Sequence, residues 1–231
     1  RLSNIPVNYL KRHLGNIPIE YVQHHQSHAA AGYYTSPYEE SCIVVIDAIG
    51  EFETCTIWYA YGSHFEKRFS LKYPNSLGLW YSAMTQRIGL KPQEDEYILM
   101  GMDAWGTRDK ELKQNIYNDF FEKGDLPLQM KENLHRGCMK WNPLYYPDNN
   151  TEEWKFNIAA NVQWICEEEI QKVFKIAQEL VPETQNCVYM GGVALNCVAN
   201  SIIAKDYYPN LWIFPNPGDA GSSLGSAAYL F

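Results

Sequence analysis

Apolar positions along the 231-residue chain follow two different spacings, and each spacing predicts one kind of element. Continuous apolar and β-branched runs predict strands at residues 41–47, 54–61, 187–190 and 211–214. Helical spacing predicts helices at residues 7–15, 23–34, 76–89, 151–180 and about 195–204. Strands that alternate with helices in this way indicate an α/β fold. The first two strands flank the glycine-containing turn AIGEFE, which predicts a β-hairpin with Asp47 at its tip.

The segment from residue 107 to residue 150 breaks this pattern, because it is rich in charged and turn-forming residues. It carries little chemical signal, and we expect a surface insertion there. A chain of this length buries a sizeable core, and its length favours a single domain over residues 1–231.

Composition narrows the class of protein. Hydrophobic residues make up 46% and charged residues 20% of the chain, as in ordinary globular proteins. The net charge of −8 disfavours broad binding to nucleic acid, which needs many contacts from Lys or Arg to phosphate. No apolar run approaches the roughly 18 residues of a membrane span. Most cysteines lie in apolar stretches, which predicts buried free thiols and favours the cytoplasm. The cysteines are Cys42, Cys55, Cys138, Cys166, Cys187 and Cys197.

The sequence HHQSH places two histidines, His24 and His28, four residues apart on a predicted helix. Side chains at this spacing share one face, so both imidazoles can reach one metal ion. A histidine-rich polar helix face is the alternative, and spacing alone favours it. His25 lies between them and points in another direction, where it acts on a substrate or is simply solvated.

Two aspartates stand beside glycines at the ends of apolar runs. Asp47 follows the run CIVVI, and Asp219 lies in the turn PNPGD. Each has a structural alternative, because Asp47 can hydrogen-bond its own loop and Asp219 can cap a helix. Together with two imidazoles, two carboxylates form a plausible site for a divalent metal such as iron.

The sequence MGGVALNCVAN predicts a strand that turns at glycines into a helix. Such a turn allows close approach of a ligand to the backbone, and a helix N-terminus favours an anion. Close packing of a strand against a helix is the steric alternative. The candidate nucleotide contacts are Gly191, Gly192, Val193, Asn196 and Asn200.

Five segments, in this order, resemble the O-carbamoyltransferases of nodulation-factor and antibiotic biosynthesis: HHQSHAAAGYYTSPYEE, VIDAIGE, YPNSLGLWYSAMTQRIGL, MGGVALNCVAN and PGDAGSSLGSAA. The resemblance implies a catalytic domain related to the tRNA threonylcarbamoyl transferases, with the actin-like, sugar-kinase-like (ASKHA) ATPase fold. It also implies that His24, His28, Asp47 and Asp219 bind Fe²⁺ in a cleft between lobes. The segment GGVALN then contacts the nucleotide part of a carbamoyl-adenylate, and His25 is a candidate general base.

The implied reaction uses ATP and carbamoyl phosphate to form carbamoyl-adenylate, whose carbamoyl group passes to a hydroxyl of a small molecule or sugar. The family also carries an upstream phosphate loop and a C-terminal domain that makes the adenylate. Neither is present in the sequence, so we expect a partial catalytic domain, incomplete at the N-terminus. Ile98 stands where the family usually has lysine, and Asn75 where histidine is common.

These observations leave three hypotheses for the protein. The first is a cytoplasmic O-carbamoyltransferase, with a small-molecule acceptor and no membrane or nucleic-acid partner. The second is transfer to a tRNA adenosine, which the negative net charge disfavours. The third is a nucleotide-binding module without catalysis, suggested by the missing phosphate loop and by Ile98.

Overall fold

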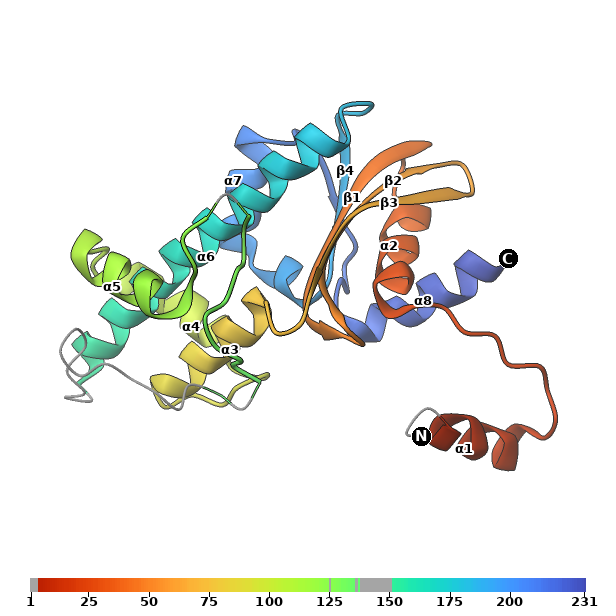
Figure 1. Cartoon of the computed structure of the whole chain (residues 1–231), viewed down its shortest axis with the longest axis horizontal. Helices are drawn as coiled ribbons and strands as arrows, with labels where there is room; N and C mark the ends of the chain where they lie inside the picture. Colours follow the sequence, from red (N-terminus) through yellow and green to blue (C-terminus); the bar gives the residue numbers. More distant parts are fainter. Residues whose placement is uncertain (1–3, 125, 136, 138–150) are drawn as a thin grey trace.

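A computed structural model describes residues 4–124, 126–135, 137 and 151–231 of the chain (Figure 1). Its five-stranded sheet has the order β3-β2-β1-β4-β5. Strand β2 runs antiparallel to β1 and β3, whereas β4 and β5 run parallel to β1. The strands are β1 (Glu40–Gly50), β2 (Glu53–Tyr61), β3 (His64–Lys72), β4 (Asn186–Met190) and β5 (Asn210–Ile213). The α/β class and the β-hairpin predicted from the sequence are therefore confirmed. The prediction that Asp47 lies at the hairpin tip is wrong, because β1 continues to Gly50 and the turn is at residues 51–52.

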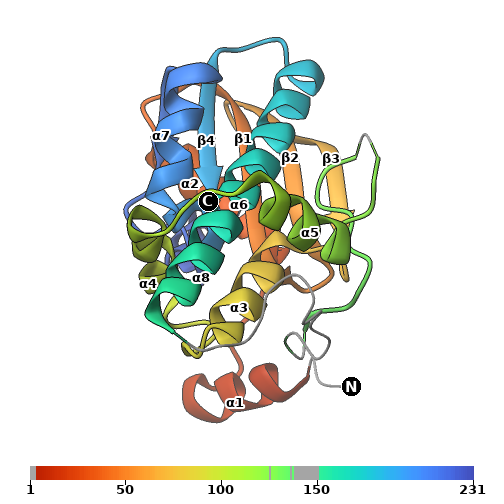
Figure 2. The ribbon, with the colours of Figure 1, turned by 90° about the vertical axis from the view of Figure 1, so that its left-hand side faces the viewer.

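Helices cover both faces of the sheet (Figures 1 and 2). On one face lie α2 (His24–Thr35) and α8 (Asp219–Leu230), and on the other α3 (Leu77–Arg87), α6 (Glu152–Leu180) and α7 (Cys197–Asp206). The remaining helices are α1 (Asn4–Leu14), α4 (Glu96–Met102), α5 (Lys110–Phe120) and the short 3₁₀ turns η1 (Asp103–Trp105) and η2 (Gly192–Leu195). Helix α1 stands apart from the sheet in Figure 1.

Strand β1 lies in the middle of the sheet and is buried on both faces, which explains its continuous apolar run. Successive side chains of a strand point to opposite faces. Val44 and Ile46 therefore pack in the core under α3 and α6, whereas Ile43 and Val45 pack in the core under α2. Asp47 is two residues beyond Val45, so the same alternation directs its carboxylate to the face of α2.

Helices α2 and α8 pack closely because small residues line their contact. A Cβ atom on Gly225 would lie 1.9 Å from the carbonyl oxygen of Ser27 and 2.4 Å from the amide nitrogen of Ala31. The hydroxyl groups of Ser27 and Ser226 are hydrogen-bonded at 2.8 Å. This seam fixes the start of α2 relative to the start of α8.

The described part of segment 107–150 is not confined to the surface, contrary to the surface insertion expected from its composition. Helix α5 packs against α6, and Ile116, Phe120, Phe121 and Leu128 are buried in the main core. Its apolar residues are few, but they face the core. The many charged residues around them mask this contribution in the sequence pattern. Residues 138–150 lie outside the described part.

Other sequence predictions have mixed outcomes. The helix at 151–180 is confirmed as α6, which begins after Thr151, whose side chain accepts a hydrogen bond from the Trp154 amide. Strand β3 was not predicted, because its charged residues interrupt the apolar pattern on an edge strand. The five described cysteines are free, and four of them are buried, as expected; Cys138 lies outside the described residues. None of the helices in the described ranges has the length and apolar character of a membrane span.

The seam between α2 and α8 predicts the effect of replacing its glycine. Gly225→Ala should lower the free energy of unfolding by about 1–3 kcal/mol, because the added methyl forces the two helices apart. The matched control is Gly101→Ala in α4, where a Cβ atom meets nothing within 4 Å. There the higher helix propensity of Ala should stabilise the protein by about 1 kcal/mol. Urea unfolding of both variants measures the two effects, and an equal shift in both would contradict the close packing.

Candidate functional site

The candidate site lies where the parallel strands β1, β4 and β5 end. Ligands bind at this edge in open α/β sheets. Asp47 lies near the end of β1, where the pairing with β2 is irregular. The loop at Gly191 follows β4, and Asp219 follows β5 as the first residue of α8. Helix α2 adds its first turn from the neighbouring layer. Segments that are distant in the sequence therefore meet at one point.

Four side chains converge there, each with one potential ligand atom, and these atoms all lie within 4.8 Å of one another. The Nε2 atoms of His24 and His28 are 3.0 Å apart. Asp47 Oδ2 lies 3.1 Å from the first and 3.3 Å from the second. Asp219 Oδ1 lies 3.2 and 3.3 Å from the same two atoms. The candidate metal ligands predicted from the sequence are thus brought together.

This arrangement fits a divalent ion. Bonds of about 2.0–2.2 Å to nitrogen and oxygen place neighbouring ligand atoms roughly 3–3.5 Å apart. The separations that involve a histidine nitrogen, 3.0–3.3 Å, lie in that range. His28 is fully buried and its Nε2 atom faces the cluster, so a solvated polar face does not describe this helix. Two imidazoles with two carboxylates suit borderline ions such as Fe²⁺ or Zn²⁺.

The two oxygen atoms of the Asp47 carboxylate have different partners. Its Oδ1 atom accepts hydrogen bonds from the backbone amides of Ala48 at 2.8 Å and Gly192 at 3.3 Å. Its Oδ2 atom remains directed at the two imidazoles. Burial raises the pKa of Asp47, but hydrogen bonds from His24 and His28 outweigh burial and hold the pKa well below its usual range. The group is therefore ionised at neutral pH.

The hydrogen bond to Asp47 also raises the pKa of His24, against the opposing effect of burial. Asp219 contributes a further negative charge in the same direction. The side chain of Asp219 is 73% exposed and makes no capping hydrogen bond at the start of α8, where Gly218 is the N-cap. Its carboxylate is thus the open member of the cluster, facing both imidazoles and solvent.

The glycine pair after β4 lets the backbone approach β1. Gly191 has a φ of 92°, and a Cβ atom there would lie 2.2 Å from the carbonyl oxygen of Ile46. A side chain at Gly192 would approach Asp47 Oδ1 to 3.1 Å. Gly191 is therefore required for close packing, which was the steric alternative. The same close approach brings the Gly192 amide to Asp47.

The two asparagines of this segment are engaged within the protein. Asn196 caps α7 by accepting from the Ala199 amide, and it exchanges two hydrogen bonds with the side-chain amide of Gln163 at 2.9 and 3.0 Å. Asn200 donates to the carbonyl oxygen of Ala194 at 2.7 Å. Asn196 lines the cavity, whereas Asn200 does not. Helix α7 begins at Cys197, so its N-terminus lies beyond the glycines.

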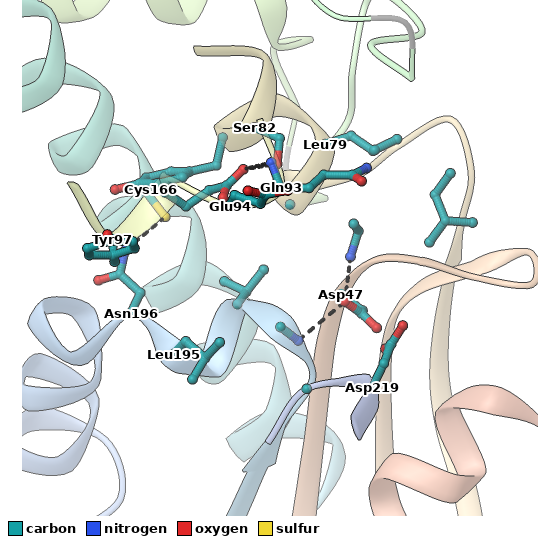
Figure 3. A pocket seen from close by; sticks show the side chains of 18 of the residues that line it. Asp47, Leu79, Ser82, Gln93, Glu94, Tyr97, Cys166, Leu195, Asn196 and Asp219 are labelled. Carbon is teal, nitrogen blue, oxygen red and sulfur yellow. Dashed lines mark hydrogen bonds between the residues drawn. The ribbon is translucent and has the colours of Figure 1, made fainter. Parts of the chain in front are cut away.

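A cavity of about 590 Å³ opens next to the cluster (Figure 3). Asp47, Asp219 and the η2 loop form one end. Figure 3 shows the opposite wall, where Ser82 of α3 lies near Gln93 and Glu94 of the following segment, while Tyr97 lies near Asn196. Cys166 of α6 and Asn196 close the side between them. The volume is in the range of small-molecule sites, about 300–1,000 Å³.

Sequence reasoning did not identify the wall made by residues 93–100. Glu96 accepts hydrogen bonds from the Ser82 hydroxyl and from the Gln93 amide, which orders this segment. The run QEDE was a visible cluster of polar groups after a predicted helix, but only tertiary packing turns it towards Asp47. No Lys or Arg belongs to the described lining, whereas Glu94 and Glu96 add negative charge to that of the aspartates. An anionic ligand therefore needs a cation from elsewhere.

Three further sequence candidates lie away from the cavity lining. His25 is 1% exposed and faces the sheet, with Nδ1 at 2.9 Å from Thr56 Oγ1. Ile98 is half-buried in α4, and its neighbours Tyr97 and Met100 line the cavity in its place. Asn75 accepts a hydrogen bond from the Met130 amide at 2.8 Å, which ties down the segment after α5.

The charge coupling in the cluster predicts a pH window for metal-free protein. The lowered pKa of Asp47 gives stability that is present above its ordinary value of 3.8 and is lost as the pH falls. The raised pKa of His24 gives stability that is complete below 6.5 and is lost as the pH rises through the raised value.

The unfolding free energy of chelator-treated wild type minus that of Asp47→Asn should thus be greatest between about pH 4 and pH 6.5. Urea unfolding across this range measures the difference. A difference that keeps increasing above pH 8 would contradict an ion pair between Asp47 and His24.

Known proteins resemble this chain in sequence over most of its length. Residues 7–228 match the family model described as Carbamoyltransferase N-terminus. The protein sll1178 of Synechocystis is 32% identical over 214 residues, which cover 87% of this chain and 35% of the relative. The nodulation protein NolO of Bradyrhizobium diazoefficiens is 24% identical over 203 residues, covering 87% of this chain and 36% of the relative. The chain spans about a third of the length of these curated relatives.

Solved structures agree with the topology. The activator of 2-hydroxyisocaproyl-CoA dehydratase from Clostridium difficile, with bound ADPNP, has a TM-score of 0.54 at 15% identity, covering 90% of this chain and 65% of its own. HypF of T. kodakarensis has a TM-score of 0.55 at 12% identity, covering 98% of this chain and 38% of its own. These similarities concern the fold alone, and they confirm the actin-like, sugar-kinase-like ATPase fold. By the match over residues 7–228, the chain belongs to the carbamoyltransferase family, in the part described as its N-terminus.

Proposed function

We propose that the full-length protein is an O-carbamoyltransferase and that this chain supplies its metal- and nucleotide-binding site. The observation that carries the proposal is the convergence of two imidazoles and two carboxylates at one end of a cavity, in a chain of the carbamoyltransferase family. The family match favours this function over transfer to tRNA. An ionised Asp47 and a ligand set that stays open on the side of the exposed Asp219 favour an active centre over a module without chemistry.

In the proposed reaction, water hydrolyses carbamoyl phosphate to carbamate and phosphate. A carbamate oxygen then attacks the α-phosphorus of ATP, and pyrophosphate leaves, which yields carbamoyl-adenylate. A hydroxyl oxygen of a small-molecule or sugar acceptor then attacks the carbamoyl carbon. The new carbon–oxygen bond forms as the bond between the carbamoyl carbon and the phosphate oxygen breaks, which releases AMP. The proton of the hydroxyl passes to solvent or to a basic group. We also propose that a C-terminal domain makes the adenylate and that the protein acts in the cytoplasm.

We assign a divalent metal, Fe²⁺ by family resemblance, to His24, His28, Asp47 and Asp219. The donor set fits, and the cavity itself supports the need for a cation, because its described lining has carboxylates and no Lys or Arg. When bound, the ion supplies positive charge that stabilises negative charge on phosphate or carbonyl oxygens. The two histidines and two aspartates would hold it, and the Gly192 amide keeps Asp47 in its orientation.

We assign the nucleotide to the η2 loop and the adjoining walls. Gly192 and Val193 line the cavity beside the cluster, and Gly191 permits their close approach to β1. Asn196 fixes the far end of the loop through Gln163, and Asn200 holds it through the carbonyl oxygen of Ala194. These contacts support a rigid loop whose backbone faces the ligand.

Metal binding should depend on the buried histidine. Full-length protein loaded anaerobically with Fe²⁺ should hold one ion at this site. His28→Ala should lower the affinity for Fe²⁺ by more than about tenfold, because even a partner that only orients a ligand contributes that much. Isothermal titration measures the affinity. The control is His64→Ala, an exposed histidine in β3. Equal affinities in wild type and His28→Ala would remove the metal assignment.

Transfer should require both the metal site and ATP. Full-length protein with ATP, radiolabelled carbamoyl phosphate and a panel of hydroxyl acceptors should produce carbamoyl ester and AMP in equal amounts. Asp219→Ala should reduce transfer by more than about a hundredfold, since metal assistance is worth several kcal/mol. Chromatography of the labelled ester measures the rate. Ester formation without ATP, or at full rate in Asp219→Ala, would refute the proposed function.

A further inference from the structure

The imidazole of His25 is placed differently from those of its neighbours. It is 1% exposed, and it lies on the side of α2 that packs on the sheet. A general base has to come within about 2.6–3.2 Å of the proton that it removes, directly or through one water. The Nε2 atom of His25 is buried without a hydrogen-bond partner among the described residues. Its position therefore does not suit the role of base that the sequence suggested.

A short hydrogen-bond chain defines what His25 contacts. The indole Nε1–H of Trp58 donates to Thr56 Oγ1 at 2.8 Å. An indole can only donate, so the Thr56 hydroxyl oxygen accepts from Trp58, and the same oxygen makes a second hydrogen bond with His25 Nδ1 at 2.9 Å. This chain links His25 to β2.

This contact lies in the first turn of α2, beside the Ser27 hydroxyl, which hydrogen-bonds to Gln23 and to Ser226 on the side of α8. Gln23 is the N-cap residue and makes no side-chain capping hydrogen bond. His24 and His25 are the first two residues of the helix. The bond from His25 to Thr56 therefore ties the start of α2 to β2, while the neighbouring His24 ring faces the cluster.

The backbone at the end of β1 fills the space between the two rings. A Cβ atom on Gly50 would lie 2.4 Å from Cδ2 of His25 and 2.5 Å from Cδ2 of His24. The two imidazoles thus pack against the same glycine. A change in the orientation of His25 displaces this contact, and with it the His24 ring.

We propose that His25 is a positioning residue, which holds the first turn of α2 on Thr56 so that His24 and His28 keep their Nε2 atoms directed at Asp47. The inference rests on the proposed metal site. It assigns His25 a mechanical role through other residues, without contact to substrate. The shared face of Gly50 extends this role to His24 in particular.

Thr56→Val tests the proposal without changing the histidine. Valine keeps the shape of threonine and removes the hydroxyl, so the first turn of α2 loses the hydrogen bond between His25 and β2. The affinity of full-length protein for Fe²⁺, measured by anaerobic titration, should fall by about 10–100-fold, as for other groups that orient a metal ligand. Thr54→Val is the matched control, because Thr54 is equally buried on β2 but its hydroxyl donates to the carbonyl oxygens of Leu71 and Asn75. It should leave the affinity within about twofold.

His25→Asn separates positioning from base catalysis. The asparagine amide offers an oxygen acceptor near the place of Nδ1 and has no group at the place of Nε2. Positioning predicts an affinity for Fe²⁺ within a few-fold of wild type for His25→Asn and a large loss for His25→Ala. Should Thr56→Val fail to fold, Thr56→Ser, which keeps the hydroxyl, should bind Fe²⁺ like wild type.

The failures are distinguishable. Wild-type protein that binds no Fe²⁺ would refute the metal site, and the positioning role with it. Wild-type binding together with unchanged binding in folded Thr56→Val or in His25→Ala would refute the positioning role alone. Unchanged binding in His25→Ala with abolished transfer would return His25 to the role of base.

Discussion

The shared carboxylate of Asp47 is the interaction on which the site depends. One oxygen accepts the amides of Ala48 and Gly192, and the other faces two imidazoles. Because a buried carboxylate is costly unless it is hydrogen-bonded, this residue needs both sets of partners. It thereby ties the loop after β4 to the first turn of α2. A change at either partner alters the orientation of the same group, so the metal cluster and the proposed nucleotide loop form one unit.

Small residues make this unit possible. Gly191 lets the loop reach Ile46, Gly225 brings α8 against α2, and Gly50 lies between the rings of His24 and His25. Each glycine permits a close approach that positions a side chain or a backbone group of a neighbouring residue. The sheet provides the rigid base, since β1, β4 and β5 all end at the same edge. The site therefore depends on backbone proximity as much as on its four acidic and imidazole side chains.

Much of this was accessible from the sequence, because periodicity fixes direction. Spacing of four placed His24 and His28 on one helical face. The face of Asp47 was not predicted, because the continuous apolar run of β1 hides the alternation of its side chains. Edge strand β3 was missed because its charges obscure alternation, and the wall at Glu94 and Glu96 was missed because only packing of α3 and α4 turns it inward. The burial of His25 was missed for a similar reason. Local sequence gives a side chain's direction on a helix but does not reveal which neighbour covers it.

The central claim is that these four side chains bind a divalent metal at one end of the cavity. Diffraction from crystals of the full-length protein grown with Fe²⁺, recorded at the iron absorption edge, tests it most directly. If the four side chains bind the metal, one anomalous peak should lie about 2.0–2.2 Å from Nε2 of both histidines and from an oxygen of Asp47 and of Asp219. An empty cluster, or iron bound elsewhere while the four side chains keep their positions, would contradict the account.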